Sequence, residues 1–411
     1  MKFLYFHQHF STPKGSTGTR SYEMARSLVA RGHQVTMVCG SYGGGETGLS
    51  SAFVHGRRSG QVDGIDVVEL DLAYSNSDGF LKRAWVFLKF AGRSVGIALR
   101  EKYDVVFATT TPLTAGIPGI FARWLRGKPF VFEVRDLWPE LPREMGVITN
   151  PVVLGAMSVL EWGSYRSATR CVGLSPGIVD GIARLGVPRE RITLIPNGCD
   201  LDIFSGDQEP WRPEGVGRDD LLAAFTGTHG IANGLDAVLD AAAELKRRGR
   251  SDIKLVLVGQ GKLKPDLQAR AEREGLDNVV FHPPVSKTKL AGLMAATDVG
   301  MQILANVPAF YYGTSPNKFF DYIAAGLPVL NNYPGWLAGM IEEERCGFAV
   351  PPDDPVAFAD ALEPAAADRD ALKVMGENGR KLAVREFDRR ILADRFVRWL
   401  AGAAGQPADH G

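Results

Sequence analysis

The chain has little cysteine, no excess of either charge and no long apolar run. Its four cysteines, Cys39, Cys171, Cys199 and Cys346, stand far apart and form neither a Cys-x-x-Cys pair nor a zinc-binding spacing. This pattern indicates small buried thiols and gives no sign of an oxidising compartment. Because 47 basic side chains balance 47 acidic ones, no overall positive field favours nucleic acid as a partner.

The apolar segments are short. No stretch reaches the roughly 18 apolar residues that span a bilayer, and the opening MKFLYFHQHFSTPKG holds too short an apolar run for the core of a signal peptide. We therefore expect a cytoplasmic protein. A length of 411 residues is too great for one hydrophobic core, so two domains are expected.

The chain is rich in apolar strands that alternate with helical patterns. Strand-like runs lie at residues 3–6, 34–40, 104–111, 129–136 and 168–175, and again at 221–227, 253–261, 278–282, 298–304, 327–330 and 347–350. This rhythm predicts an α/β fold with two Rossmann-like domains, each built on a parallel sheet. We expect an N-terminal domain over 1–200 and a C-terminal domain over 201–385; residues 386–411 would form a helix crossing back to the first domain and a frayed tail.

Ligands of open parallel sheets bind beyond the carboxyl ends of the strands, so the loops there are candidate sites. In the first domain, a loop with Gly15, Ser16 and Thr17 precedes a helix that begins near Arg20. Backbone amides at a helix N-terminus attract anions, which predicts a phosphate or acceptor loop. The spacing is not Gly-x-Gly-x-x-Gly, and an ordinary Gly-Ser loop is the alternative.

Two glycine-rich loops in the second domain are candidates for binding a nucleotide diphosphate. The donor-binding residues expected from them are Gly227, Thr228, Gly230, Asn233, Gly259, Gly261 and Lys262. Glycines allow a phosphate to approach the backbone closely, and a lysine such as Lys262 or Lys264 supplies a mobile positive charge. The alternatives are tight turns without a ligand and solvated lysines.

A third candidate segment is Ser315-Pro316-Asn317-Lys318, with Asp321 one turn later. Pro316 suits the first turn of a helix, whose free amides and dipole, with Lys318, would face a phosphate. Asp321 would accept hydrogen bonds from ribose hydroxyls. The alternative for Asp321 is helix-dipole complementarity, worth only about 0.3–1 kcal/mol, and that alternative leaves the rest of the cluster unexplained.

The order and spacing of these motifs resemble a known family. RGHQVTMV, VRDLWPE, IPNGCD, LVGQG and FFDYIAAGLPVL together resemble the family 4 retaining glycosyltransferases of the GT-B fold, of the bacterial O-antigen and capsule type that includes N-acetyl-L-fucosaminyltransferases. The resemblance implies two domains that face each other across a cleft, with a UDP-sugar bound by the second and the acceptor by the first. It implies no metal and no further cofactor.

The chain departs from the family pattern at the donor site. Asp321 stands where the family often has a glutamate, and Gly313 stands where a first glutamate precedes it by eight residues. Thr228 and Asn233 replace an arginine and a lysine, so the charge of the diphosphate would fall to Lys318, Lys262 or Lys264. These departures keep open a nucleotide-sugar-binding subunit impaired in catalysis. A UDP-sugar epimerase is a further alternative, but it needs more acid and base groups.

The segment FEVRDLWPE ends a first-domain strand and carries Arg135 and Asp136. Asp136 would orient or deprotonate the acceptor hydroxyl, or else it caps the following turn. We therefore take Asp136 and Lys318 as the candidate catalytic residues. The resemblance implies attack on the face from which the diphosphate leaves, with the diphosphate helping to take the proton.

Residues 79–100 mix large apolar side chains with cations, among them Lys82, Arg83, Trp85 and Lys89. This composition suits an interfacial helix on an anionic membrane, and a core helix with a basic outer face is the alternative. We therefore expect a peripheral enzyme on the inner face of the cell membrane. It would move an N-acetylated hexosamine or deoxyhexosamine from a UDP-sugar to a polyprenyl-diphosphate-linked saccharide in surface polysaccharide synthesis.

Overall fold

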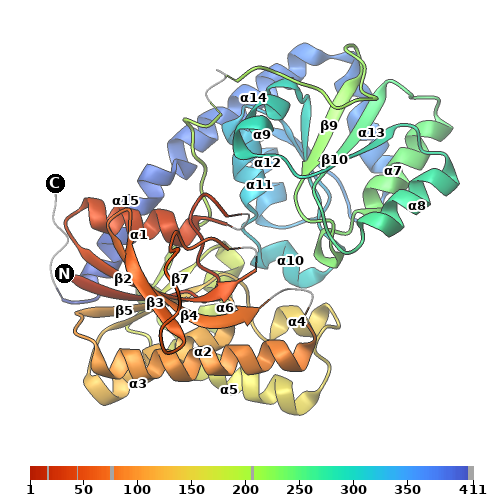
Figure 1. The fold of residues 1–411 in the computed structure, drawn as a ribbon. Coiled ribbons are helices and arrows are strands. Elements are labelled where there is room, and N and C mark those ends of the chain that lie inside the picture. The colour runs from red at the N-terminus through yellow and green to blue at the C-terminus, as the bar shows by residue number, and fades with distance from the viewer. Residues whose placement is uncertain (16–17, 44, 75–77, 205–207, 406–411) are drawn as a thin grey trace. The chain divides into compact units, whose positions relative to one another are not determined.

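A computed structural model describes residues 1–15, 18–43, 45–74, 78–204 and 208–405. The chain divides into two compact units (Figure 1). The first contains Met1–Pro196, Gly313–Ser315 and Arg390–Gly411, and the second contains Asn197–Tyr312 and Pro316–Arg389. Apart from the short segment Gly313–Ser315, the chain changes unit after Pro196 and after Arg389, where the sequence suggested residues 200 and 385.

The first unit is built on an eight-stranded sheet in the order β3-β4-β2-β1-β5-β6-β7-β8. Its strands are β1 Lys2–Phe6, β2 Gln34–Tyr42, β3 Arg57–Val62, β4 Ile65–Tyr74, β5 Val105–Thr109, β6 Phe130–Val134, β7 Arg170–Gly173 and β8 Ile192–Leu194. All neighbours run parallel except β3 and β4. That hairpin turns at Asp63-Gly64, where both residues have positive φ (49° and 83°).

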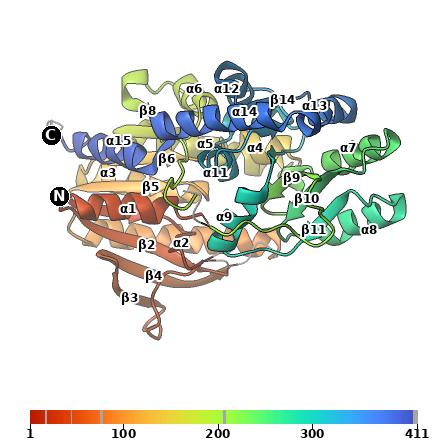
Figure 2. The same cartoon turned by 90° about the horizontal axis from the view of Figure 1, so that it is seen from above.

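Helices cover both faces of this sheet because residues of its central strands alternate between two cores. Phe3 and Tyr5 of β1 join the core under α1 and α15, whereas Leu4 and Phe6 join the core under α2, α3 and α5. Figure 2 shows α1 beside α15. The helices of this unit are α1 Arg20–Ala30, α2 Phe80–Arg100, α3 Ile117–Arg126, α4 Glu140–Glu144, α5 Pro151–Ser167, α6 Pro176–Arg184 and α15 Arg389–Gly402.

The second unit holds a six-stranded, wholly parallel sheet in the order β11-β10-β9-β12-β13-β14. Its strands are β9 Leu221–Thr226, β10 Ile253–Val258, β11 Val279–His282, β12 Val299–Gln302, β13 Val329–Asn331 and β14 Gly347–Ala349. Its helices are α7 Asp236–Arg247, α8 Lys264–Glu274, α9 Lys287–Ala296, α10 Pro308–Gly313, α11 Asn317–Ala324, α12 Trp336–Glu344, α13 Pro355–Ala367 and α14 Arg369–Leu382. The predicted architecture of two Rossmann-like α/β domains is confirmed.

Two details differ from the expectations drawn from the sequence. The β3-β4 hairpin is absent from the predicted strands because β3 is polar and largely exposed. The sequence of α15 spaces Ile391, Leu392, Phe396 and Leu400 as one apolar stripe. The last three are buried in the first unit, but Ile391 is exposed. Its place in the buried stripe is taken by Ala393 and Val397.

Candidate functional site

The donor-site candidates of the second unit begin with two loops that leave the sheet side by side. Thr226 at the end of β9 pairs in register with Val258 at the end of β10. A Cβ on Gly259 would lie 1.8 Å from the carbonyl oxygen of Gly227, and Gly259 has φ 154°. A Cβ on Gly261 would lie 2.3 Å from the carbonyl oxygen of His229. Loop-to-loop packing therefore already requires Gly259 and Gly261, for which the sequence offered either close approach of a phosphate or a tight turn without a ligand.

Lys318 is brought to the first of these loops from almost a hundred residues away in sequence. Its Nζ donates to Oδ1 of Asn233 at 2.9 Å and lies 4.2 Å from the centroid of the Phe225 ring. The amide of Asn233 in turn donates to the carbonyl oxygen of Thr228 at 2.7 Å. Three predicted donor-binding residues thus form one connected group at the carboxyl edge of the sheet, where ligands of such sheets bind.

The side chain of Lys318 gains or loses its proton near neutral pH. Burial against the protein lowers the pKa of Lys318 to about 7, because a charged amine loses hydration there. An anion bound beside it would restore the charge. A lysine with a lowered pKa on the first turn of a helix at the carboxyl edge of the sheet is a candidate phosphate ligand.

Helix α11 carries Lys318 on its first turn and is held firmly on the sheet. The hydroxyl of Tyr322 accepts a hydrogen bond from the backbone amide of Thr226 at 3.0 Å. The Tyr322 ring packs on Gly300 of β12, where a Cβ would lie only 2.5 Å from it. Pro316 is the residue before the helix (φ −74°, ψ 126°), so the amides of Asn317 and Lys318 open the helix and lack partners within it.

Asp321 follows one turn later, and its carboxylate has no hydrogen-bond donor among the residues that the structure describes. It is partly accessible to solvent. Burial raises the pKa of Asp321 to about 6, while Lys287 and Arg389 lower it and Asp200 raises it. Those two cations are occupied by Asp200, which Lys287 approaches at 3.1 Å and Arg389 at 2.5 Å. Asp321 is therefore a free acceptor that is mostly ionised at neutral pH.

The remaining predicted donor-site residues differ in whether the structure leaves them available to a ligand. Lys262 is exposed, so its ammonium remains available. Lys264 is not available: its Nζ is buried and donates to the carbonyl oxygens of Gly259 at 2.8 Å and His282 at 3.1 Å, which corrects its assignment to the diphosphate. Gly230 has no close backbone neighbour that a Cβ would meet. Ser315 belongs to the segment Gly313–Ser315, which groups with the first unit rather than with the donor loops.

His229 is a buried residue of the donor loop that the sequence reading missed. Its side chain is fully buried, with ring centroids 6.2 Å from both Phe225 and Phe281. Within the described part of the chain neither ring nitrogen has a hydrogen-bond partner. Burial, followed by Lys264 and Lys318, lowers the pKa of His229 to about 4, so the ring is neutral. The signal was the Thr-His-Gly triplet directly after a strand.

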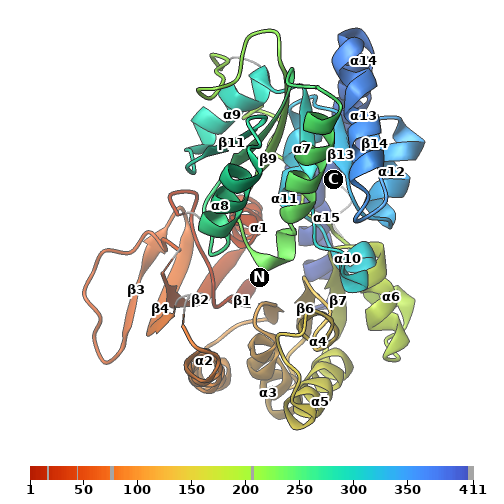
Figure 3. The same ribbon diagram turned by 90° about the vertical axis from the view of Figure 1, so that its right-hand side faces the viewer.

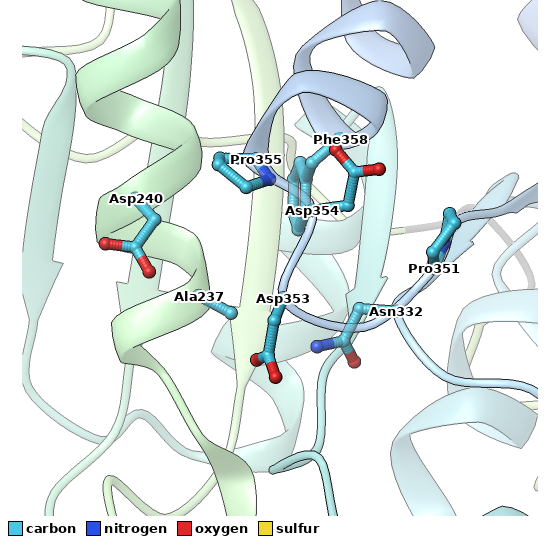
Figure 4. A pocket seen from close by; sticks show the side chains of 8 residues that line it. All are labelled: Ala237, Asp240, Asn332, Pro351, Asp353, Asp354, Pro355 and Phe358. Carbon is cyan, nitrogen blue, oxygen red and sulfur yellow. The ribbon is translucent and has the colours of Figure 1, made fainter.

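A small pocket elsewhere in the second unit does not fit a donor. It lies between α7 and the loop that enters α13, and Asp240, Asp353 and Asp354 line it (Figure 4). Its cavity volume is about 10 Å³, which suits about one water molecule. Each carboxylate already has a partner: Asp353 accepts from Asn306, Asp354 caps α13, and Asp240 pairs with Arg270.

In the first unit, Asp136 follows β6 at the carboxyl edge of the sheet, as predicted. Its side chain is partly accessible. Burial raises the pKa of Asp136 to about 6, against the opposing effects of Arg135 and a hydrogen bond from Thr111. A carboxylate that titrates just below neutral pH at a strand edge has the properties of a general base.

Arg20 lies elsewhere than its predicted role requires. Its side chain is buried, and its guanidinium donates to the Glu133 carboxylate at 2.8 Å and to the carbonyl oxygens of Ile195 and Pro196. Arg135 also binds Glu133, at 3.2 Å, and donates to the hydroxyl of Ser21 at 2.7 Å. Arg20 therefore belongs to a buried Arg20–Glu133–Arg135 triad, and its assignment to a phosphate loop is wrong.

Of the other loop residues predicted here, Gly15 donates its amide to the Thr12 carbonyl at 3.1 Å. Ser16 and Thr17 lie outside the described residues. The polar residues that do gather at the carboxyl end of β1 are His7, Gln8 and Thr12, which the sequence reading passed over. All three are buried, and each has a side-chain nitrogen or oxygen without a partner in the described structure. The run FHQHF, polar at the end of an apolar strand, was their signal.

The predicted membrane residues lie on α2. Trp85 is exposed, and the ammonium of Lys89 lies 5.2 Å from its ring centroid. Lys82 pairs with Asp78 at 2.7 Å, and Arg83 is half-buried. No helix in the described ranges is long and apolar enough to cross a membrane. Nor do the described residues include a group of three or more His, Cys, Asp or Glu side chains that could hold a metal ion.

Comparison with known proteins gives the family of both halves. Residues 15–198 match the glycosyl transferase 4-like domain and residues 221–368 match the glycosyl transferases group 1 domain. D-inositol 3-phosphate glycosyltransferase of Nocardia farcinica is 31% identical over 200 residues, 46% of this chain and 43% of that protein. O-antigen chain mannosyltransferase C of Escherichia coli is 25% identical over 230 residues, 55% of this chain and 57% of that protein.

The chain spans about half the length of the curated relatives it matches. Among solved structures, HepE of Anabaena in complex with UDP-glucose has a TM-score of 0.69 at 18% identity, and the match covers 98% of this chain and 100% of that one. At that identity the likeness concerns the fold, which is the predicted one. The two domain models and the shared fold together establish that the chain belongs to the two-domain glycosyltransferases of the GT-B type.

Proposed function

We propose that this protein is a retaining glycosyltransferase that moves a sugar from a UDP-sugar to a polyprenyl-diphosphate-linked saccharide during surface polysaccharide synthesis. The sugar would be an N-acetylated hexosamine or deoxyhexosamine, and no metal would be needed. The protein would work on the inner face of the cell membrane, which Lys82, Arg83, Trp85 and Lys89 of α2 would contact.

The observation that carries the proposal is the grouping of Lys318, Asn233 and Asp321 around the first turns of α11. The Lys318 ammonium and the opening amides of α11 suit the oxygens of a diphosphate. The free Asp321 carboxylate, one turn along the same helix, suits paired ribose hydroxyls. A cation and an acceptor at that spacing match the two polar ends of a nucleoside diphosphate.

The first unit supplies the acceptor side of the proposal. In the reaction, the acceptor oxygen bonds to the anomeric carbon on the face from which UDP departs, and the carbon–oxygen bond to the diphosphate breaks. The hydroxyl proton passes to the leaving diphosphate, with Asp136 orienting the hydroxyl or accepting the proton. Lys318 stabilises the charge that develops on the diphosphate.

Two relatives lend support. HepE of Anabaena was solved with UDP-glucose, which supports a UDP-sugar as donor. A mannosyltransferase of O-antigen chains supports a saccharide acceptor in surface polysaccharide synthesis. The Nocardia relative acts, by its name, on D-inositol 3-phosphate, so a soluble acceptor is the comparison to include in any test.

The test is release of UDP from a panel of UDP-sugars, with and without a bacterial polyprenyl-lipid extract, and with D-inositol 3-phosphate in a parallel series. We expect release that needs the lipid extract and is limited to one or two sugars. UDP binding without release from any sugar would contradict the proposal and favour a catalytically impaired binding subunit. Release that needs only the inositol phosphate would overturn the lipid-linked acceptor.

Asp321→Asn is expected to weaken UDP binding by about ten- to a hundredfold, because the variant loses charge-assisted hydrogen bonds to the ribose. Calorimetric titration with UDP measures the loss. The matched control is Asp266→Asn, an exposed carboxylate in the first turn of α8. The 2′-deoxy analogue sharpens the test: it should bind the wild type more weakly than UDP does, and the Asp321 variant should no longer distinguish the two. Equal affinity of wild type and variant for UDP would exclude the ribose role.

Asp136→Asn is expected to lower kcat about a hundredfold while leaving UDP affinity unchanged, because it removes a base from the acceptor side. Since burial raises the pKa of Asp136 to about 6, kcat of the wild type at saturating donor should fall as the pH drops below about 6. The variant should lack that acid limb. An unchanged kcat would show that the leaving diphosphate takes the proton without help from Asp136.

A further inference from the structure

Three neighbouring helices of the first unit turn large apolar side chains outward. Helices α2, α3 and α5 pack side by side on one face of the sheet (Figure 3). Each presents one exposed tryptophan: Trp85 is 60% exposed, Trp124 67% and Trp162 53%. Further exposed apolar side chains on the same helices include Leu81, Leu125 and Val152. Single exposed apolar residues are common, but a cluster across three adjacent helices marks an interaction surface.

The exposed side of α5 is apolar, unlike the exposed side of a helix that faces solvent. Val152, Val159 and Trp162 are exposed and repeat at helical spacing, and no charged residue occurs between Pro151 and Leu160. The opposite side of α5 packs on the core through Leu160 and Tyr165. A helix that is apolar on both sides is normally buried in protein or in lipid.

The charge of the three helices points to the partner. Within a chain of zero net charge, these helices carry one carboxylate, Glu161, and eight cations: Lys82, Arg83, Lys89, Arg93, Arg100, Arg123, Arg126 and Arg166. Aromatic and aliphatic side chains surrounded by lysine and arginine are the composition of surfaces that lie on anionic lipid headgroups. Tryptophan is the residue that most favours the headgroup level.

The three helices are held as one surface. Nε1 of Trp124 donates to the Ser167 hydroxyl at 2.8 Å and so ties α3 to α5. A Cβ on Gly116, just before α3, would lie 2.5 Å from the Ser164 hydroxyl, which shows how closely the two helices approach. The tryptophans therefore project from a preformed face and need no folding step on contact with a partner.

We propose that α2, α3 and α5 together form a docking face for an anionic lipid bilayer, into whose headgroup region Trp85, Trp124 and Trp162 insert. The inference rests on the proposed membrane-bound acceptor and widens the contact from α2 alone to three helices. A second copy of this chain is a poor occupant, since the three helices together carry eight cations and one carboxylate, and like charges would meet across a two-fold axis.

The test is co-sedimentation of the full chain with phosphatidylglycerol vesicles, with phosphatidylcholine vesicles as the uncharged reference. The informative variant is Trp124→Ser with Trp162→Ser, because it lies outside α2. We expect it to lower the partition coefficient on phosphatidylglycerol at least about tenfold. Arg123→Glu with Arg166→Glu should lower it to a similar extent and weaken its salt dependence. Val356→Ser with Val374→Ser, two exposed valines of the second unit, is the matched control and should bind like the wild type.

Vesicle binding needs neither donor nor acceptor, so the experiment stays decisive even if transfer of sugar fails. An unchanged circular dichroism spectrum and an unchanged urea midpoint of each variant show that the first unit is intact, and Trp162→Ser alone serves if loss of the Trp124–Ser167 bond unfolds the unit. Full vesicle binding by both α3–α5 variants, with loss only on neutralising Lys82, Arg83 and Lys89, would restrict the contact to α2 and overturn the three-helix face. Absence of vesicle binding together with a dimer that the tryptophan variant breaks would assign the face to a second copy.

Discussion

Lys318→Met is expected to lower kcat/KM for the UDP-sugar by about a hundred- to a thousandfold, the loss typical of removing one preorganised charge from a transition state. Methionine fills a similar volume beside the Phe225 ring, so the packing of α11 should persist. Because the charge on the leaving diphosphate grows as the sugar departs, kcat should fall more than the affinity for the UDP-sugar. Steady-state kinetics and calorimetry together separate these two effects.

The lowered pKa of Lys318 also predicts that the protein takes up a proton when UDP binds. Burial lowers the pKa of Lys318 to about 7, so at pH 8 most of the free protein carries a neutral amine that must gain a proton when the diphosphate binds. Titration with UDP in buffers of different ionisation enthalpy should therefore show proton uptake at pH 8. Asp136 and Asp321, with pKa values of about 6, are already ionised there, as are the phosphates, and His229 remains neutral.

Lys318→Met should abolish the uptake, and Lys373→Met, which changes an exposed lysine, should leave both the kinetics and the uptake unchanged. Uptake that persists in the Lys318 variant would move the role to another group.

How much of the fold could be predicted depends on which physical signal each element carries. The run 129–136 predicted β6, observed at Phe130–Val134, because a strand covered on both faces must be apolar throughout. β3 has no such signal, since its pattern is polar and its pairing comes from the hairpin at Asp63-Gly64. The Asp-Gly pair was itself a readable hairpin signal between the two strands.

The sequence predicted the candidate-site residues whose signal lies within one short segment. It could not predict contacts between residues that are far apart in the chain. Lys318 and Asp321 could be found because a proline, a lysine and a carboxylate open one helix. That Lys318 rests on Asn233 could not, because that contact joins residues 85 positions apart. Arg20 and Lys264 looked like anion ligands in sequence, yet buried carbonyl oxygens and a buried carboxylate use their charges. Sequence composition cannot distinguish a cation that faces a ligand from one that pairs with buried acceptor groups of the protein itself.

Glu133→Gln is expected to destabilise the first unit by about 3–5 kcal/mol, since it removes the buried carboxylate that the buried guanidinium of Arg20 and the partly buried guanidinium of Arg135 share. Glu133 is fully buried between Arg20 and Arg135, and it also accepts a hydrogen bond from Thr109 at 2.7 Å. Glutamine keeps the shape and an acceptor oxygen, so the loss measures charge rather than packing. Urea unfolding should show a lower midpoint with an unchanged slope.

The pH dependence of this difference identifies its cause. Burial alone would raise the pKa of Glu133, but Arg20, Arg135 and Thr109 together hold it below the usual value of 4.5. A carboxyl group with a lowered folded-state pKa stabilises the protein fully above about pH 4.5 and loses that contribution as the pH falls through the folded-state value. The difference in the free energy of unfolding between wild type and Glu133→Gln should therefore be constant near neutral pH and shrink towards zero in acid. Glu140→Gln, which breaks the solvent-exposed pair with Arg184 in the same unit, is the matched control and should cost less than about 1 kcal/mol. A gap for Glu133→Gln as small as that of the control would mean that water reaches the triad and that its charges are not buried in solution.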